Sequence, residues 1–116
     1  MTMSDRDIDP MAAVEYMIAK SGEYAQAKAN RIYCEEYRKS LKSMLMKQAM
    51  VEGHNAANAQ EREAYAHADY MTHLKALQAA VEAEEKLRWM LIAAEARIEV
   101  WRSQEASKRS EIKAVM

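Results

Sequence analysis

Hydrophobic and polar residues follow the period of an α-helix along the first part of the chain. Apolar side chains recur there every three or four positions: Met11, Val14, Met17, Ile18, Ala25, Ala29, Ile32, Tyr33, Tyr37, Leu41, Met44 and Leu45. Asp9 followed by Pro10 is a strong helix start, because the Asp side chain accepts hydrogen bonds from the first turn and proline fits the first helical position. The pattern predicts a first helix over residues 10–51, preceded by a flexible lead over residues 1–8.

Glycine occurs at two positions where the helical pattern can bend or end. At Ser21 and Gly22 the sequence allows either a bend or a break, since glycine costs a helix interior about 1 kcal/mol relative to alanine. Gly53 can take the left-handed conformation that closes a helix, and Asn58 can cap the helix that follows. We therefore predict a loop over residues 52–58.

A second helix is predicted over residues 59–114, because neither glycine nor proline occurs after Gly53. Two apolar rows repeat there every seven residues: Tyr70, Leu77, Leu91, Ile98 and Ile112, and Ala80, Leu87, Ala94, Trp101 and Val115. Glu84 and Glu105 interrupt the first row, so the coiled-coil pattern is imperfect. Two long helices with a short connection predict an all-α fold, a long antiparallel helical hairpin with coiled-coil-like packing, in a single domain of residues 1–116.

The segment from Leu87 to Trp101 is more apolar than a hairpin requires. Its apolar residues cover roughly two-thirds of the helix circumference, whereas a surface helix needs a stripe of only about 100°. We therefore expect self-association into a dimer or a larger helical bundle. The expected self-association or partner face comprises Trp89, Ile92, Ala96, Val100 and Trp101. Two alternatives stay open: residues 11–20 fold over this face as a third helix, or the face docks another protein.

Composition and charge narrow the function classes. The net charge is −1 with 30% charged residues, which does not favour strong non-specific attraction to nucleic acid. The single Cys34 cannot form an internal disulfide and the acidic start is unlike a signal peptide, so we expect a cytoplasmic setting. No apolar run is long enough for a membrane span, and we expect no membrane partner.

The sequence carries no catalytic or metal-binding motif. His67, Asp69 and His73 attract attention, but the two histidines are six residues apart and point to different faces of a helix. Cys34 is expected to be a small buried residue and the histidines to be solvated. With no histidine–carboxylate metal motif, cysteine cluster or glycine-rich phosphate loop, we expect no catalytic residue, no metal, no cofactor and no enzymatic activity.

Methionines and basic residues suggest further surfaces. Met44, Met46 and Met50 form either an adaptable binding surface or gap fillers in a helix pair, and the second interpretation is favoured. Clustered basic residues are the candidates for phosphate contacts. The nucleic-acid candidates are Arg38, Lys39, Lys42, Arg102, Lys108 and Arg109.

The C-terminal stretch HLKALQAAVEAEEKLRWMLIAAEARIEVWRSQEASKRSE resembles small all-helical proteins of unknown function from the early regions of tailed bacteriophages and prophages, often encoded near recombination genes. The part AAEARIEVWRSQEASKR, residues 93–109, is similar to their recurring end. The resemblance covers somewhat under half of the chain and brings no catalytic residues to transfer. It implies the cytoplasm of a bacterial host and a role in phage takeover or phage DNA metabolism.

Two functions therefore compete. The first is a non-enzymatic helical interaction protein that self-associates and binds a host or phage protein as an adaptor or inhibitor. The second is an accessory DNA-binding protein of phage recombination or replication. The near-neutral charge and the apolar surplus favour the first.

Overall fold

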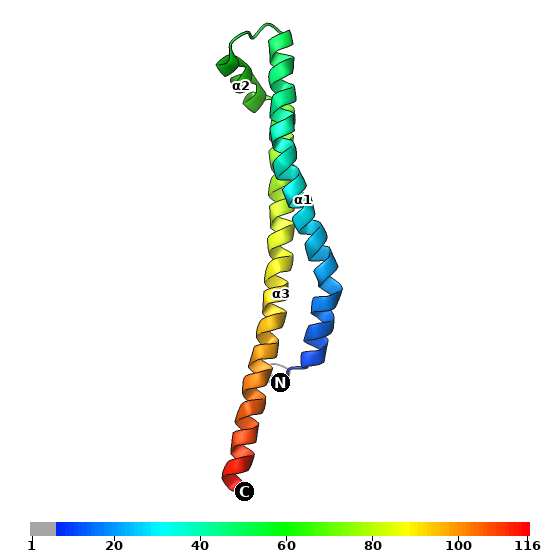
Figure 1. Ribbon diagram of the computed structural model, residues 1–116, viewed down its shortest axis with the longest axis vertical. Coiled ribbons are helices and arrows are strands. Elements are labelled where there is room, and N and C mark those ends of the chain that lie inside the picture. Colours follow the sequence, from blue (N-terminus) through cyan, green and yellow to red (C-terminus); the bar gives the residue numbers. More distant parts are fainter. Residues whose placement is uncertain (1–6) are drawn as a thin grey trace. The chain divides into compact units, whose positions relative to one another are not determined.

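A computed structural model describes residues 7–116 and shows three α-helices, with no strand in that range (Figure 1). Helix α1 spans Pro10–Val51, α2 spans Ala57–Ala66 and α3 spans Ala68–Val115. The predicted all-α helical hairpin is confirmed, with α1 and α3 as its long arms. Most of the lead predicted over residues 1–8 lies outside the described residues. None of the described helices has an apolar stretch long enough to cross a membrane.

The start of α1 matches the prediction. Asp9 Oδ1 accepts hydrogen bonds from the backbone N–H groups of Met11 at 3.0 Å and Ala12 at 3.1 Å, and the helix begins at Pro10. The helix then continues without a break through Ser21 and Gly22. An isolated glycine lowers helix stability by only about 1 kcal/mol, which the long helix on both sides outweighs.

The end of α1 is closed by Gly53, as predicted. Its φ is +109°, and its N–H donates to the carbonyl of Met50 at 3.1 Å, while the N–H of His54 donates to Ala49 at 3.0 Å. These two bonds form a Schellman motif, which satisfies carbonyls at the end of the helix. The predicted capping by Asn58 is wrong, because α2 begins at Ala57 and places Asn58 inside the helix.

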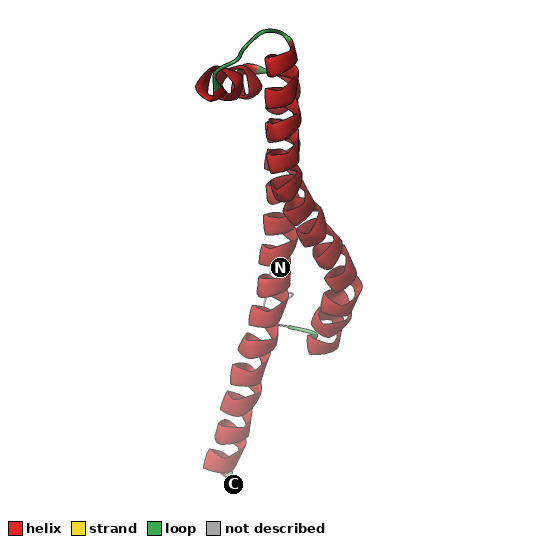
Figure 2. Ribbon diagram, turned by 45° about the horizontal axis from the view of Figure 1, so that its top comes forward, coloured by secondary structure: helices red, strands yellow, loops and turns green. Residues whose placement is uncertain are grey.

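The single helix predicted over residues 59–114 is also wrong, because the chain forms a short helix and a separate long helix there (Figure 2). His67 lies between them. The backbone of His67 is extended, with φ −70° and ψ 141°, and its N–H donates to Ala64 at 3.2 Å. Its ring Nδ1 accepts from the N–H of Asp69 at 3.0 Å. One residue therefore ends α2 and caps α3, in a place that no glycine or proline marks.

The described residues divide into two compact units, where the sequence predicts one domain. The first unit, Ala25–Glu85, contains the end of α1, all of α2 and the start of α3. Its core brings all three helices together, and Ala64 of α2 is completely buried. The core residues are Leu41, Leu45, Ala64 and Tyr70, with Tyr37, Met46 and Leu74 packed against them. We call this part the α2 unit.

The second unit joins the described residues up to Tyr24 with Lys86–Met116, and we call it the terminal unit. Its only buried residues within the described range are Ala13 and Ala94, at 7% and 6% exposure. Burial stabilises in proportion to the apolar area removed from water, and alanine contributes little area. The terminal unit therefore has a much smaller interior than the α2 unit.

Candidate functional site

An exposed apolar strip runs along α3 in the terminal unit. Trp89 is 59% exposed, Val100 48% and Ile92 36%, and the small side chains of Ala93 and Ala96 are exposed between them. We call these five residues the Trp89 strip. Four of the five residues predicted for a self-association face belong to it.

Trp101, the fifth predicted residue, lies apart from the strip. It is half-buried, and twelve positions separate it from Trp89, which rotates it by about 120° around the helix. Because Trp101 lies on the seven-residue row that includes the buried Ala94, its side chain belongs to the inner face of α3. The predicted face is therefore narrower than the sequence indicates.

Nothing in the described terminal unit folds over the strip. The alternative in which residues 11–20 form a separate third helix is wrong, because these residues are the first turns of α1. They carry exposed apolar side chains of their own: Met11 at 61%, Val14 at 37% and Ile18 at 71%. A large exposed apolar surface of this kind marks an interaction site more often than a free surface.

Arg88 lies against the aromatic ring at the start of the strip. Its guanidinium carbon is 5.1 Å from the centroid of the Trp89 ring, which is a cation–π distance. Arginine and tryptophan are both enriched in the centres of protein interfaces, because a flat guanidinium stacks on a ring and is only weakly hydrated. This pair is typical of a protein-binding surface.

A groove of about 480 Å³ lies between α1 and α3 in the terminal unit. Small side chains create it, and Ala93 connects it to the Trp89 strip. The lining residues are Asp7, Asp9, Ala12, Ala13, Tyr16, Met90, Ala93, Ala94 and Arg97. The Tyr16 hydroxyl is buried and has no hydrogen-bond partner among the described residues, which is costly in a closed interior. The groove thus adds loosely packed surface beside the strip.

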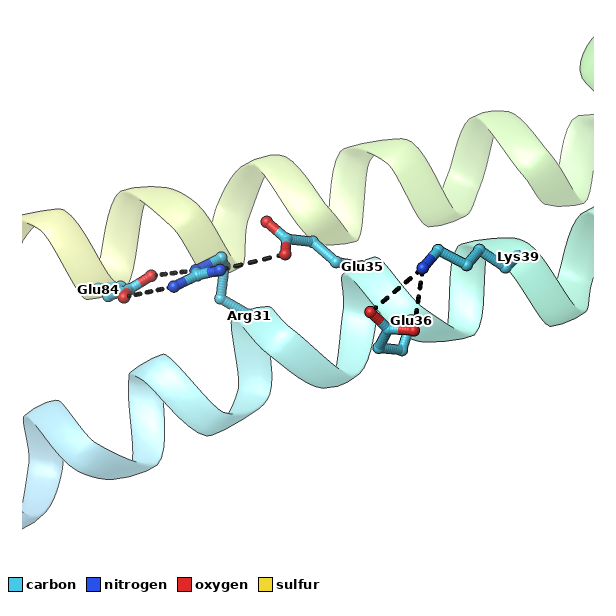
Figure 3. Close-up of polar contacts among 5 residues, drawn as sticks. All are labelled: Arg31, Glu35, Glu36, Lys39 and Glu84. Carbon is cyan, nitrogen blue, oxygen red and sulfur yellow. Dashed lines mark hydrogen bonds and ion pairs between the residues drawn. The ribbon is translucent and has the colours of Figure 1, made fainter.

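The predicted nucleic-acid contacts on α1 are largely engaged with acidic side chains. Lys39 Nζ lies 3.2 Å from Glu36 (Figure 3), and Lys42 Nζ lies 3.6 Å from Glu61. Lys42 also lies 4.8 Å above the Tyr65 ring, and the pKa of its ammonium is raised by Tyr65 first and by Glu61 second. Arg38 is exposed and makes no ion pair with another described residue.

The basic candidates near the end of α3 show the same pattern. Arg102 pairs with Glu99 at 2.8 Å and Lys108 with Glu105 at 3.4 Å, whereas Arg109 has no ion pair among residues 7–116. Four of the six predicted cations thus have an acidic neighbour. A phosphate backbone would have to displace these carboxylates, which weakens each basic group as a nucleic-acid contact.

An ion pair that sequence reasoning missed connects α1 and α3 in the α2 unit (Figure 3). Arg31 Nε donates to Glu84 Oε2 at 2.5 Å and its Nη2 to Glu84 Oε1 at 3.0 Å, while Nη1 donates to Glu35 at 3.1 Å. The hydrogen bond to Glu84 is the main cause of a raised pKa for Arg31. The Glu84 side chain is only 9% exposed, so this two-pronged bond fixes how α1 and α3 align.

His73 ties the same two helices together through the backbone. Its Nε2 donates to the carbonyl oxygen of Cys34 at 2.6 Å, which requires the proton to be on that nitrogen because a carbonyl can only accept. The ring also meets Tyr37 edge-on, with centroids 5.2 Å apart. The prediction of solvated histidines is wrong for His73 and His67, and the predicted burial of Cys34 is confirmed.

His67, Asp69 and His73 therefore have structural positions. Across residues 7–116, no three His, Cys, Asp or Glu side chains gather closely enough to hold a metal ion.

The methionines before the loop divide between the two interpretations: Met46 packs on the core, while Met44 and Met50 are 51% and 48% exposed. The gap-filler prediction is wrong for the latter two.

No protein-family model matches the chain, and comparison with curated proteins and with solved structures finds no similar protein.

Proposed function

We propose that this chain is a non-enzymatic helical interaction protein that self-associates through the Trp89 strip. It binds a protein of a bacterial host or of a phage, as an adaptor or inhibitor, in the host cytoplasm. The bacterial and phage setting rests on the resemblance of residues 73–111 to phage early-region proteins. That segment contains the whole Trp89 strip.

One observation carries the proposal: the terminal unit exposes several large apolar side chains and fully buries only alanines. Trp89 and Ile18 are 59% and 71% exposed, while Ala13 and Ala94 are the only buried residues of the described unit. Removing one such tryptophan from water stabilises an assembly by a few kcal/mol, at about 25 cal/mol per Å². A partner helix on the strip supplies the contacts that the unit itself lacks.

DNA binding is the competing proposal, and the charges support it less well. Of the predicted contacts on α1, Arg38 has no ion pair with another described residue, but Lys39 and Lys42 beside it already face acidic side chains. Under the competing proposal, Arg38→Ala/Lys42→Ala lowers a salt-sensitive affinity for DNA. We expect no such affinity at physiological salt in an electrophoretic or fluorescence titration.

The first experiment measures molar mass by light scattering over a range of protein concentrations. We expect a mass of two or more chains for the wild type and a lower mass for Trp89→Ala/Val100→Ala at the same concentration. Met44→Ala/Met50→Ala is the matched control, because it removes similar exposed area in the α2 unit and leaves the strip intact. A monomer at every concentration would contradict the proposed self-association.

The second experiment tests the protein partner. A helical hairpin that acts as an adaptor or inhibitor should retain a bacterial protein from a lysate when immobilised, and the retained protein should be identified by mass spectrometry. Retention by the wild type and by the Met44→Ala/Met50→Ala control, with loss in Trp89→Ala/Val100→Ala, supports partner binding through the strip. Retention of DNA in place of protein would support the competing proposal.

A further inference from the structure

We propose that the Trp89 strip pairs antiparallel with the same strip of a second copy of this chain. Trp89 then lies opposite Val100 of the second copy, and Ala93 lies opposite Ala96 of the second copy. The inference rests on the proposed self-association and specifies its direction and register. It concerns only residues of α3 within the terminal unit.

Four of the five strip residues have the same spacing in both directions, whereas Ile92 comes level with Arg97 of the second copy. Four positions separate Trp89 from Ala93, three separate Ala93 from Ala96, and four separate Ala96 from Val100. In a two-fold symmetric interface, residue i contacts residue j and residue j contacts residue i. Trp89, Ala93, Ala96 and Val100 therefore meet an inverted copy of themselves position by position.

The sizes of the side chains fit this register. The exposed Ala93 and Ala96 occupy the middle of the strip next to Ile92, and the large exposed Trp89 and Val100 occupy its ends. Two crossing helices are closest at the crossing point and separate on either side, and small residues at that point permit a close approach. Antiparallel pairing places one Trp89 and one Val100 at each end. Parallel pairing would place two tryptophans together at one end and two valines at the other.

The charged residues beside the strip are also complementary in this register. Arg88 and Glu99 are eleven positions apart, about three helical turns, so they lie along the same edge of the strip. Antiparallel pairing brings that edge against its own copy, and Arg88 comes within about two residues, or 3 Å along the axis, of Glu99 of the second copy. The symmetric dimer contains this opposite-charge pair twice.

On the other edge, Arg97 lies about five residues, or 7.5 Å along the axis, from Arg97 of the second copy, so no like charges come directly opposite each other. Lys86 and Gln104 are eighteen positions apart, five full turns, and each lies beside the other residue of the second copy. Glu99 already pairs with Arg102 at 2.8 Å, but both side chains are more than half exposed. An exposed pair of this kind is weak, so Glu99 can turn to Arg88 of the second copy at little cost.

A cross-linking experiment tests the register directly. Lys86→Cys and Gln104→Cys are introduced separately into a Cys34→Ala background, which removes the only native cysteine. The two proteins are treated with a short bifunctional maleimide, alone and after mixing. We expect cross-linked dimers only in the mixture, because each introduced cysteine is about 25 Å or more from its own counterpart at 1.5 Å per residue. Cross-linking of either protein alone, or none in the mixture, would overturn the register.

Charge reversal gives a second test that does not depend on introduced cysteines. Arg88→Glu should raise the concentration of half-dissociation several-fold, and adding Glu99→Arg should restore the wild-type value, because the pair is re-formed with the charges exchanged. Ala96→Glu should raise that concentration at least tenfold, while Ala106→Glu, an exposed alanine outside the strip, should leave it unchanged. Failure of the Glu99→Arg rescue would contradict the proposed pair.

The outcomes separate the two proposals. If Trp89→Ala/Val100→Ala lowers the mass but the mixed cysteine variants do not cross-link, the strip mediates self-association and the antiparallel register is wrong. If the wild type stays monomeric at all concentrations, both the register and the proposed self-association are wrong. Circular dichroism melts of each variant identify any that has lost its helical structure.

Discussion

The guanidinium of Arg31 on α1 donates two parallel hydrogen bonds to the carboxylate of Glu84 on α3, at 2.5 and 3.0 Å. Both groups lie on the seam between the helices, where the Glu84 side chain is 9% exposed. Sliding α1 by one turn would leave this carboxylate in the seam without its guanidinium. The pair therefore discriminates between registers that the apolar residues alone tolerate.

Replacing one member of this pair should be worse than replacing both. Arg31→Leu leaves the Glu84 carboxylate nearly buried without the guanidinium, and we expect the melting temperature to fall by several degrees. Arg31→Leu/Glu84→Leu should recover most of the loss, because an apolar pair of similar volume can substitute for a buried ion pair. Thermal unfolding followed by circular dichroism measures the melting temperatures of the single and the double variant. Lys39→Ala, which breaks an exposed pair, should change little; an equal loss there would contradict the importance of burial.

His67 should behave as a helix cap. His67→Ala removes the acceptor for the N–H of Asp69 and should lower the free energy of unfolding by about 1 kcal/mol, the usual value of an N-cap. His67→Asn and His67→Ser should retain most of the stability, because their side chains accept the same bond. Chemical denaturation provides the measurement. His54→Ala is the control, since His54 contributes its backbone carbonyl to Gln60 and not its ring.

The two glycines should respond in opposite directions to alanine. Gly22 lies within α1 with no atom within 4 Å of an added Cβ, so Gly22→Ala should stabilise by about 0.5–1 kcal/mol. Gly53 has a φ of +109°, so Gly53→Ala should destabilise by about 1 kcal/mol or more despite equally open space. Chemical denaturation of both variants is decisive: a gain in stability at both positions would show that the Schellman motif does not require glycine.

Lys42 should confer a stability that disappears at alkaline pH. Because its folded-state pKa is raised above the ordinary lysine value of 10.5, its contribution is complete below that value and is lost as the pH rises through the raised pKa. Lys42→Met keeps the side-chain stem over Tyr65 and removes the charge, so it should be less stable than the wild type at pH 8. The difference should narrow above pH 10.5 in denaturation curves. A constant difference across this range would show that charge is not its source.

Hydrophobic periodicity predicted the helices of this chain well because burial in a hairpin follows a simple period. The end of α1 at residue 51 was predictable from Gly53, and its start from Asp9 and Pro10, since each of these residue types has a specific backbone role. The row through Ala80 and Ala94 correctly marked the inner face of α3.

Polar contacts were harder to predict, since they depend on which residues of two helices come opposite each other. The seven-residue pattern places Glu84 on the seam, but the pattern within one helix does not pair it with Arg31. The available signal was that Arg31 lies on the inner row of α1, three residues before the buried Cys34. His67 gave no signal at all, because capping by an imidazole is not among the common helix-start patterns.

Because the terminal unit fully buries only Ala13 and Ala94, its stability depends on protein concentration. A segment whose apolar contacts are completed only by association gains stability from mass action, so its opening free energy rises with the amount of protein present. Amide hydrogen exchange at the start of α1 and at the end of α3 should slow as the sample is concentrated, while exchange around Leu45 should not. In a cell, the level of expression would then decide how much of this chain resists proteolysis.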